Sequence, residues 1–154
     1  MIDLAHIHPM LVHFPLALLP LAICVQIFAL YRRQGLFGRS CPASMAILLL
    51  VLAAVAAVVA AVFGDMALDH ALDTGVPMAS MEEHEELGQA TAVLLAILAA
   101  VELWCYWKSV SGVAVERLLL LANIMLLAVL LVTAWFGGHL VYDLGVNVMG
   151  HATH

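Results

Sequence analysis

The sequence predicts an all-α integral membrane protein, built as a four-helix transmembrane bundle. Two observations carry this prediction. Of its 154 residues, 66% are hydrophobic and only 10% are charged, whereas a soluble domain is about half apolar and about a quarter charged. The chain also contains four apolar runs that each reach the roughly 20 residues a helix needs to cross a bilayer. Nothing in it resembles the alternating strands of an outer-membrane barrel.

The four helices are predicted at residues 9–31, 43–63, 87–107 and 118–136, within one domain that covers residues 1–154. An outer loop over residues 64–86 and an outer tail over residues 137–154 complete the chain. The second helix contains "AAVAAVVAAVFG", in which small residues recur every four positions. That spacing lets helix backbones approach closely inside lipid, so this helix is predicted to lie at the centre of the bundle.

The basic residues predict the orientation of the bundle. All five lie between the first and second helices or between the third and fourth, namely Arg32, Arg33, Arg39, Lys108 and Arg117. The positive-inside rule makes that side cytoplasmic and places both termini outside. The net charge of -6, concentrated in the acidic loop, argues against nucleic acid as a partner. Three cysteines give no disulfide framework.

Histidines gather at the predicted outer ends of the helices. His8 and His13 open the first helix in "HPMLVHFP", His84 opens the third, and His139 follows the fourth. Imidazoles that converge from different helices can hold haem or a transition metal. The sequence therefore predicts cofactor binding by His13 and His84 with His8 as a competing ligand. His139 and Met10 complete the candidate metal ligands.

Haem b is the first candidate cofactor, and copper, which binds imidazole and thioether, is the second. A chain without a cofactor is equally tenable, because a histidine at a membrane interface can simply hydrogen-bond a headgroup or a carbonyl. The sequence contains no C-x-x-C-H or other recognised metal motif. It also shows no nucleophile elbow or phosphate-binding glycine loop, so we expect an electron-transfer or accessory protein rather than an enzyme.

A second polar group lies nearer the predicted inner side. Gln26, Glu102 and Asn123 fall at similar depth on the first, third and fourth helices, and Glu102 is the only acid deep within a span. Hydrogen bonding between helices is the favoured interpretation. Pairing of Glu102 with Arg33 or Arg117, or a proton or quinone-headgroup site, is the alternative.

An internal repeat is visible in the helix ends. The second helix leaves the membrane as "VAAVFGD" and the fourth as "VTAWFGG", while "HPML" and "HEEL" open the two hairpins. A duplication of this kind would be parallel, about an axis along the membrane normal. It predicts that His8 and His84 face each other across the bundle. Convergence of membrane-exit chemistry is the alternative.

The stretches "HPMLVHFPLALL", "GDMALD", "HEELG" and "GGHLVYDLGVNV" together resemble the domain-of-unknown-function 2231 family of predicted bacterial membrane proteins. The resemblance covers nearly the whole chain and implies a four-helix protein of the bacterial inner membrane, with periplasmic termini. Family members are sometimes joined to cytochrome c domains, which favours electron transfer. The matching positions are His8, His13, His84, Gly137, Gly138 and Tyr142. The chain departs from the family pattern at His139 and Asn147.

These observations together predict a small redox-associated membrane protein. It would bind b-type haem, or copper, on its periplasmic face. It would pass electrons between a periplasmic cytochrome or other carrier and a larger membrane complex. A cofactor-free anchor or accessory subunit in the lipid bilayer is the first alternative. A metal-handling or transport component is the second, and it would need a homo-oligomer because four helices are few for a complete pathway.

Overall fold

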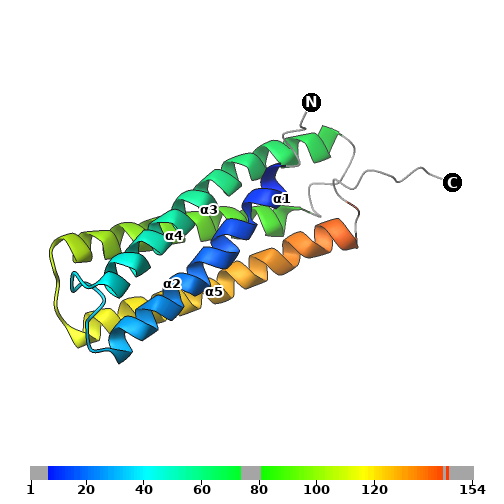
Figure 1. Cartoon of the computed structure of the whole chain (residues 1–154). Coiled ribbons are helices and arrows are strands. Elements are labelled where there is room, and N and C mark those ends of the chain that lie inside the picture. Colours follow the sequence, from blue (N-terminus) through cyan, green and yellow to red (C-terminus); the bar gives the residue numbers. More distant parts are fainter. Residues whose placement is uncertain (1–6, 74–80, 144, 146–154) are drawn as a thin grey trace.

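The computed structural model describes residues 7–73, 81–143 and 145, which form a bundle of long helices lying side by side (Figure 1). The helices are α1 (Ile7–Leu11), α2 (His13–Tyr31), α3 (Cys41–Asp73), α4 (Glu82–Trp107) and α5 (Val113–Tyr142). With α1 and α2 taken together, four helices are long and apolar enough to cross a membrane. The predicted all-helical membrane class is therefore confirmed, and the location of the termini stays a prediction.

The helices are longer than predicted at the end where the histidines lie. Helix α3 runs to Asp73 and not to residue 63, α4 begins at Glu82, and α5 continues to Tyr142. Hydropathy marks only the part of a helix that lies in lipid, and a helix can continue into polar surroundings with its own backbone hydrogen bonds. The remainder of the predicted loop and tail, residues 74–80, 144 and 146–154, lies outside the described residues.

The first span is broken near its start. Helix α1 ends at Leu11 and α2 begins at His13. Pro15 has no N–H, so the carbonyl of Leu11 lacks its usual partner four residues on. The break lies between the two candidate ligands His8 and His13, and backbone bonds from Val12 to His8 and from Leu16 to Val12 continue across it.

Each helix packs against two neighbours. Helix α2 contacts α3 and α5, and α4 contacts the same two helices, so α2 and α4 occupy opposite corners of the bundle. Helix α3 has the largest buried share of the four spans, as the small-residue pattern predicts. Its Ala53 and Ala57 pack with Leu19, Leu50 and Leu95 in the main core. The bundle therefore has a close-packed interior, with α3 as its most buried helix.

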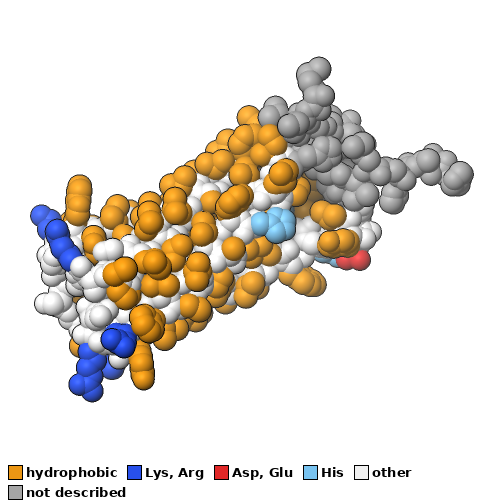
Figure 2. Space-filling model, in the orientation of Figure 1, with side chains coloured by type: hydrophobic (Ala, Val, Ile, Leu, Met, Phe, Trp, Pro, Cys, Tyr) orange, Lys and Arg blue, Asp and Glu red, His pale blue; other side chains and the backbone are white. Residues whose placement is uncertain are grey.

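The surface of the bundle is apolar along its flanks and charged at its ends. Figure 2 shows Lys and Arg side chains gathered at one end, which we call the basic end. It comprises the turns 32–40 and 108–112 and the start of α5. The opposite end carries His8, His84 and His139, and we call it the histidine end. Large apolar side chains such as Phe28, Leu48 and Ile97 are exposed between the two ends. Such a surface is stable only in lipid.

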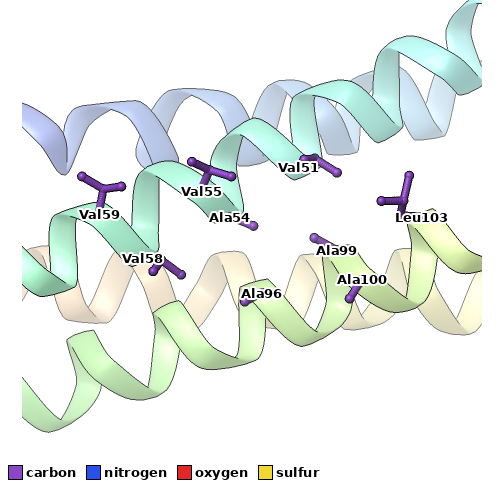
Figure 3. Close-up of a pocket in the computed structure, with 9 residues that line it drawn as sticks. All are labelled: Val51, Ala54, Val55, Val58, Val59, Ala96, Ala99, Ala100 and Leu103. Carbon is purple, nitrogen blue, oxygen red and sulfur yellow. The ribbon is translucent and has the colours of Figure 1, made fainter.

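A shallow groove of about 360 Å³ runs between α3 and α4 on this apolar flank. Figure 3 shows its walls, formed by Val51, Ala54, Val55, Val58, Val59, Ala96, Ala99, Ala100 and Leu103. Every one of these side chains is apolar. The groove therefore offers no group for chemistry.

The turns within the two helical hairpins have the same conformation. Helices α2 and α4 end at Tyr31 and Trp107, and the next residue but one, Arg33 or Ser109, has a positive φ in both cases. In both turns the following N–H bonds back five residues, from Gln34 to Ala29 and from Val110 to Cys105. This is the Schellman arrangement of helix ends. Its recurrence at the same place supports the predicted internal repeat.

Candidate functional site

His8 and His84 meet at the histidine end of the bundle. Their ring centres are 6.2 Å apart and their planes are inclined at 79°, a separation typical of aromatic rings in edge-to-face contact. His8 lies on α1 and His84 on α4, so the rings reach toward each other from different hairpins. The repeat predicted that these two histidines face each other, and the structure confirms it.

Each ring is held in the same way by the helix that ends its own hairpin. Nδ1 of His8 donates to the carbonyl oxygen of Ala60 on α3 at 2.7 Å. Nδ1 of His84 donates to the carbonyl oxygen of Thr133 on α5 at 3.1 Å. A carbonyl oxygen only accepts, so Nδ1 carries the hydrogen, and Nε2 of the neutral ring keeps its lone pair. That tautomer, fixed by a backbone carbonyl, is the one found in metal-ligating histidines.

Two glycines make room for the rings. A Cβ on Gly64 would lie 3.1 Å from Cε1 of His8, and a Cβ on Gly137 would lie 2.8 Å from Cε1 of His84. Carbon atoms in contact need about 3.5–4.0 Å. Each glycine therefore lets an imidazole lie against the helix backbone, one turn after the carbonyl that holds it.

The glycines belong to the repeated motifs "VAAVFGD" and "VTAWFGG". The site thus consists of two equivalent halves, each with a histidine, a carbonyl and a glycine. From the sequence, Ala60 and Gly64 were predicted to act only as small residues in helix packing, and Thr133 was not singled out. The repeat could have revealed this role, because in each hairpin a histidine opens the first helix and the glycine stands near the end of the second.

His13 lies apart from this arrangement. Its side chain is exposed, and its Nδ1 donates to the carbonyl oxygen of Pro9 on its own segment at 2.7 Å. Residues five positions apart on a helix point about 140° away from each other. His8 and His13 are spaced in this way, so only one of them can face the interior. The structure pairs His84 with His8, whereas the sequence favoured His13 as its partner.

The other two candidate ligands are also apart from the pair. His139 bonds Asp143 through Nδ1 at 2.5 Å and stacks on Trp135. Met10 is 68% exposed. Among the residues that the structure describes, no group of three or more His, Cys, Asp and Glu side chains is placed to hold a metal ion. The candidate site is therefore a two-histidine site.

A hydroxyl pair adjoins the histidines toward the interior. The buried Thr91 and Thr133 hydroxyls are 3.1 Å apart and link α4 to α5. Thr133 thus contacts Thr91 through its hydroxyl and His84 through its carbonyl. Through this contact the polar site continues from the two histidines to the buried threonine hydroxyls.

The second polar group is assembled near the basic end, as its common depth predicts. Gln26 donates to Oε2 of Glu102 at 2.7 Å. Nδ2 of Asn123 donates to Oε1 of Glu102 at 2.5 Å and to Oε1 of Gln26 at 3.1 Å. All three side chains are at most 1% exposed. The group joins α2, α4 and α5, as the interpretation of interhelical hydrogen bonding requires.

The pairing of Glu102 with a basic residue does not occur. In the ranges 7–73, 81–143 and 145, the ion pair present is that of His139 with Asp143. Glu102 therefore contacts neither Arg33 nor Arg117. Its partners are two uncharged amides.

One comparison with known proteins places the chain in a family. The family model described as "Predicted membrane protein (DUF2231)" matches residues 5–150. No curated protein and no solved structure matches the chain.

Proposed function

This chain belongs to the DUF2231 family of predicted membrane proteins, and we propose that it is a membrane redox subunit that holds a b-type haem between His8 and His84. The observation that carries the proposal is the meeting of two imidazoles from different hairpins, each with Nδ1 bound to a carbonyl. When bound, haem iron supplies reversible one-electron chemistry. The chain's own contribution is to hold and orient the two rings.

The spacing of the rings supports this ligand set. Both rings would hold the group through Nε2, since each Nδ1 already donates to a carbonyl, and a shared ligand requires the two ring centres to lie close together. The observed separation is 6.2 Å.

The number of ligands favours haem over a bare ion. Structural and catalytic zinc sites use three or four protein ligands, and copper electron-transfer sites also use three or more. Haem would need only two residues of this chain to hold its iron, because the porphyrin supplies the remaining ligands. The described residues offer two histidines and no third ligand beside them. Copper is less well supported, because Met10 is exposed.

The direction of the site in the membrane follows from the charges. All five Lys and Arg residues lie at the basic end, and the positive-inside rule assigns such an end to the cytoplasm. The histidine pair would then face the periplasm of a bacterial inner membrane. There it would exchange electrons with a periplasmic cytochrome or another carrier, and with a larger membrane complex.

Substitution of the two histidines tests the proposal directly. Protein purified in detergent from haem-replete cells is expected to show a Soret band and about one haem per chain. His8→Ala and His84→Ala should each lose most of this absorbance, because each removes one of the two residues that would hold the haem. The control His13→Ala should keep the wild-type spectrum, because that side chain is exposed and bonded within its own segment.

Wild-type protein without a Soret band, and without stoichiometric iron or copper by elemental analysis, would overturn the proposal. A spectrum lost in His13→Ala but kept in His8→Ala would show that the axial ligand is His13. Thermal unfolding of each variant separates a lost ligand from a lost fold.

A second candidate function is that of a cofactor-free anchor or accessory subunit. It is favoured by one observation: each ring already joins two helices of its hairpin, through the bonds to Ala60 and Thr133. Such bonds could serve stability alone. In that case His8→Ala and His84→Ala would lower the unfolding temperature, and the metal content would be zero in every variant.

A further inference from the structure

The buried carboxyl group of Glu102 has no counter-charge among its neighbours. No Asp, Glu, Lys, Arg or His occurs on the neighbouring helices within residues 14–31 of α2, 42–64 of α3 and 118–138 of α5. Within residues 87–107 of α4, Glu102 is the only residue with a charged side chain. The buried thiol of Cys105 is a titratable neighbour one helical turn away. Cys24, on α2, is exposed. A carboxylate in such surroundings carries a large desolvation penalty.

The polar contacts of Glu102 reduce this penalty but do not remove it. Two side-chain amides donate to its oxygens, from Gln26 and from Asn123. Both amides are neutral, so the negative charge has hydrogen bonds and no cation. A buried charge normally needs both. Binding of a proton removes the charge altogether.

The structure also holds a free acceptor for that proton. Oδ1 of Asn123 is buried and has no hydrogen-bond partner among the described residues. A side-chain amide can turn by half a revolution, which exchanges its oxygen and nitrogen with almost no change of shape. After the turn Oδ1 would face Oε1 of Glu102 across the 2.5 Å contact.

We propose that Glu102, Gln26 and Asn123 form a reversible proton-binding site near the basic end of the bundle. In the ionised state Asn123 donates to Glu102 and Gln26, as observed. Uptake of one proton converts the carboxylate to a carboxylic acid. Its O–H then donates to Oδ1 of the turned Asn123 amide, and Nδ2 of Asn123 no longer donates to Oε1 of Gln26, a bond of 3.1 Å in the ionised state. Gln26 keeps its bond to the other oxygen of Glu102.

This site is separate from the histidine pair. Glu102 follows His84 by 18 residues, and Gln26 follows His8 by the same number, which corresponds to about 27 Å of helix. The two polar layers therefore lie near opposite ends of the spans. Because Glu102 and Gln26 are 76 residues apart, like His8 and His84, they occupy equivalent places in the repeat. Loss of haem binding would leave the proton site unaffected.

Infrared difference spectroscopy of the full chain in lipid nanodiscs tests the proposal. Titration from acidic to mildly alkaline pH is expected to reveal a C=O band of one protonated carboxylic acid that shifts in D₂O. Glu102→Gln should lose this band. Its amide offers an acceptor oxygen and a donor group in place of the C=O and O–H of the protonated acid, so the fold is expected to persist. Glu86→Gln, at an exposed acid near the start of the same helix, is the matched control and should keep the band.

Asn123→Leu provides the second measurement on a chain that keeps Glu102. It removes the acceptor for the O–H group, so the band should move to higher frequency as its hydrogen bond is lost. If no band distinguishes the wild type from Glu102→Gln at any pH, the proposal is overturned. It is equally overturned if the band is present but does not move in Asn123→Leu, because Asn123 would then not receive the proton.

Discussion

Gly137→Ala is expected to displace the His84 ring and to lower the thermal stability of the protein. The new Cβ would lie 2.8 Å from Cε1 of His84, well inside van der Waals contact. Overpacking of this kind costs about 1–3 kcal/mol, whereas alanine gains about 1 kcal/mol over glycine in helix propensity. Displacement of the ring would also weaken its bond to Thr133, which fixes the tautomer.

The adjacent Gly138 supplies a matched control. A Cβ there meets nothing within 4 Å, so Gly138→Ala gains the same helix propensity without a clash. Unfolding in detergent, followed by circular dichroism, should therefore separate the two variants by about 1–3 kcal/mol. If haem is bound, Gly137→Ala should also lose Soret absorbance, and Gly138→Ala should keep it. Equal stability and equal spectra would contradict the role given to Gly137.

Ala57→Phe is expected to destabilise the bundle more than any single change at the histidine end. Ala57 is 6% exposed and lies in the main core, where α3 contacts both α2 and α4. Phenylalanine adds a six-carbon ring where a methyl group now fills the space, so neighbouring helices must separate. A cost of about 3 kcal/mol or more is expected, at the upper end for overpacked cores.

Val62→Phe places the same aromatic ring on the lipid-facing side of the same helix. Val62 is 52% exposed, so a larger apolar side chain there contacts lipid and should alter stability by about 0.5 kcal/mol or less. Both variants place a phenylalanine on α3, so they differ mainly in where the ring lies. The loss of alanine's helix propensity accounts for only about 0.5 kcal/mol of the difference. Similar unfolding temperatures for Ala57→Phe and Val62→Phe would show that α3 is not packed closely at Ala57.

The sequence predicted the class and the four spans because these depend on composition and length alone. It also predicted that Gln26, Glu102 and Asn123 meet, since the depth of a residue follows from its distance along a spanning helix. The helix ends were harder to predict. Hydropathy falls where lipid ends, whereas α3 continues to Asp73 and α5 to Tyr142, because backbone hydrogen bonding does not require apolar side chains.

The choice of histidine shows a different limit. His8 and His13 both lie in the opening motif, and their spacing shows only that they point in different directions. Which of them faces the interior depends on the rotation of the helix about its axis. That rotation is fixed by packing against α3, where His8 bonds Ala60 and rests on Gly64. A single sequence does not contain this information in any local pattern.

The amino-acid sequence by itself determined that this chain lies in a membrane as four helices, with its basic residues at one end and its histidines at the other. Burial in lipid is a sum over residues, so composition is enough to predict it. Tertiary structure alone decided that His8 meets His84, and that Asn123 meets Glu102 with one oxygen left free. Such contacts depend on helix rotation and on distances of a few ångströms, which only the packed bundle sets.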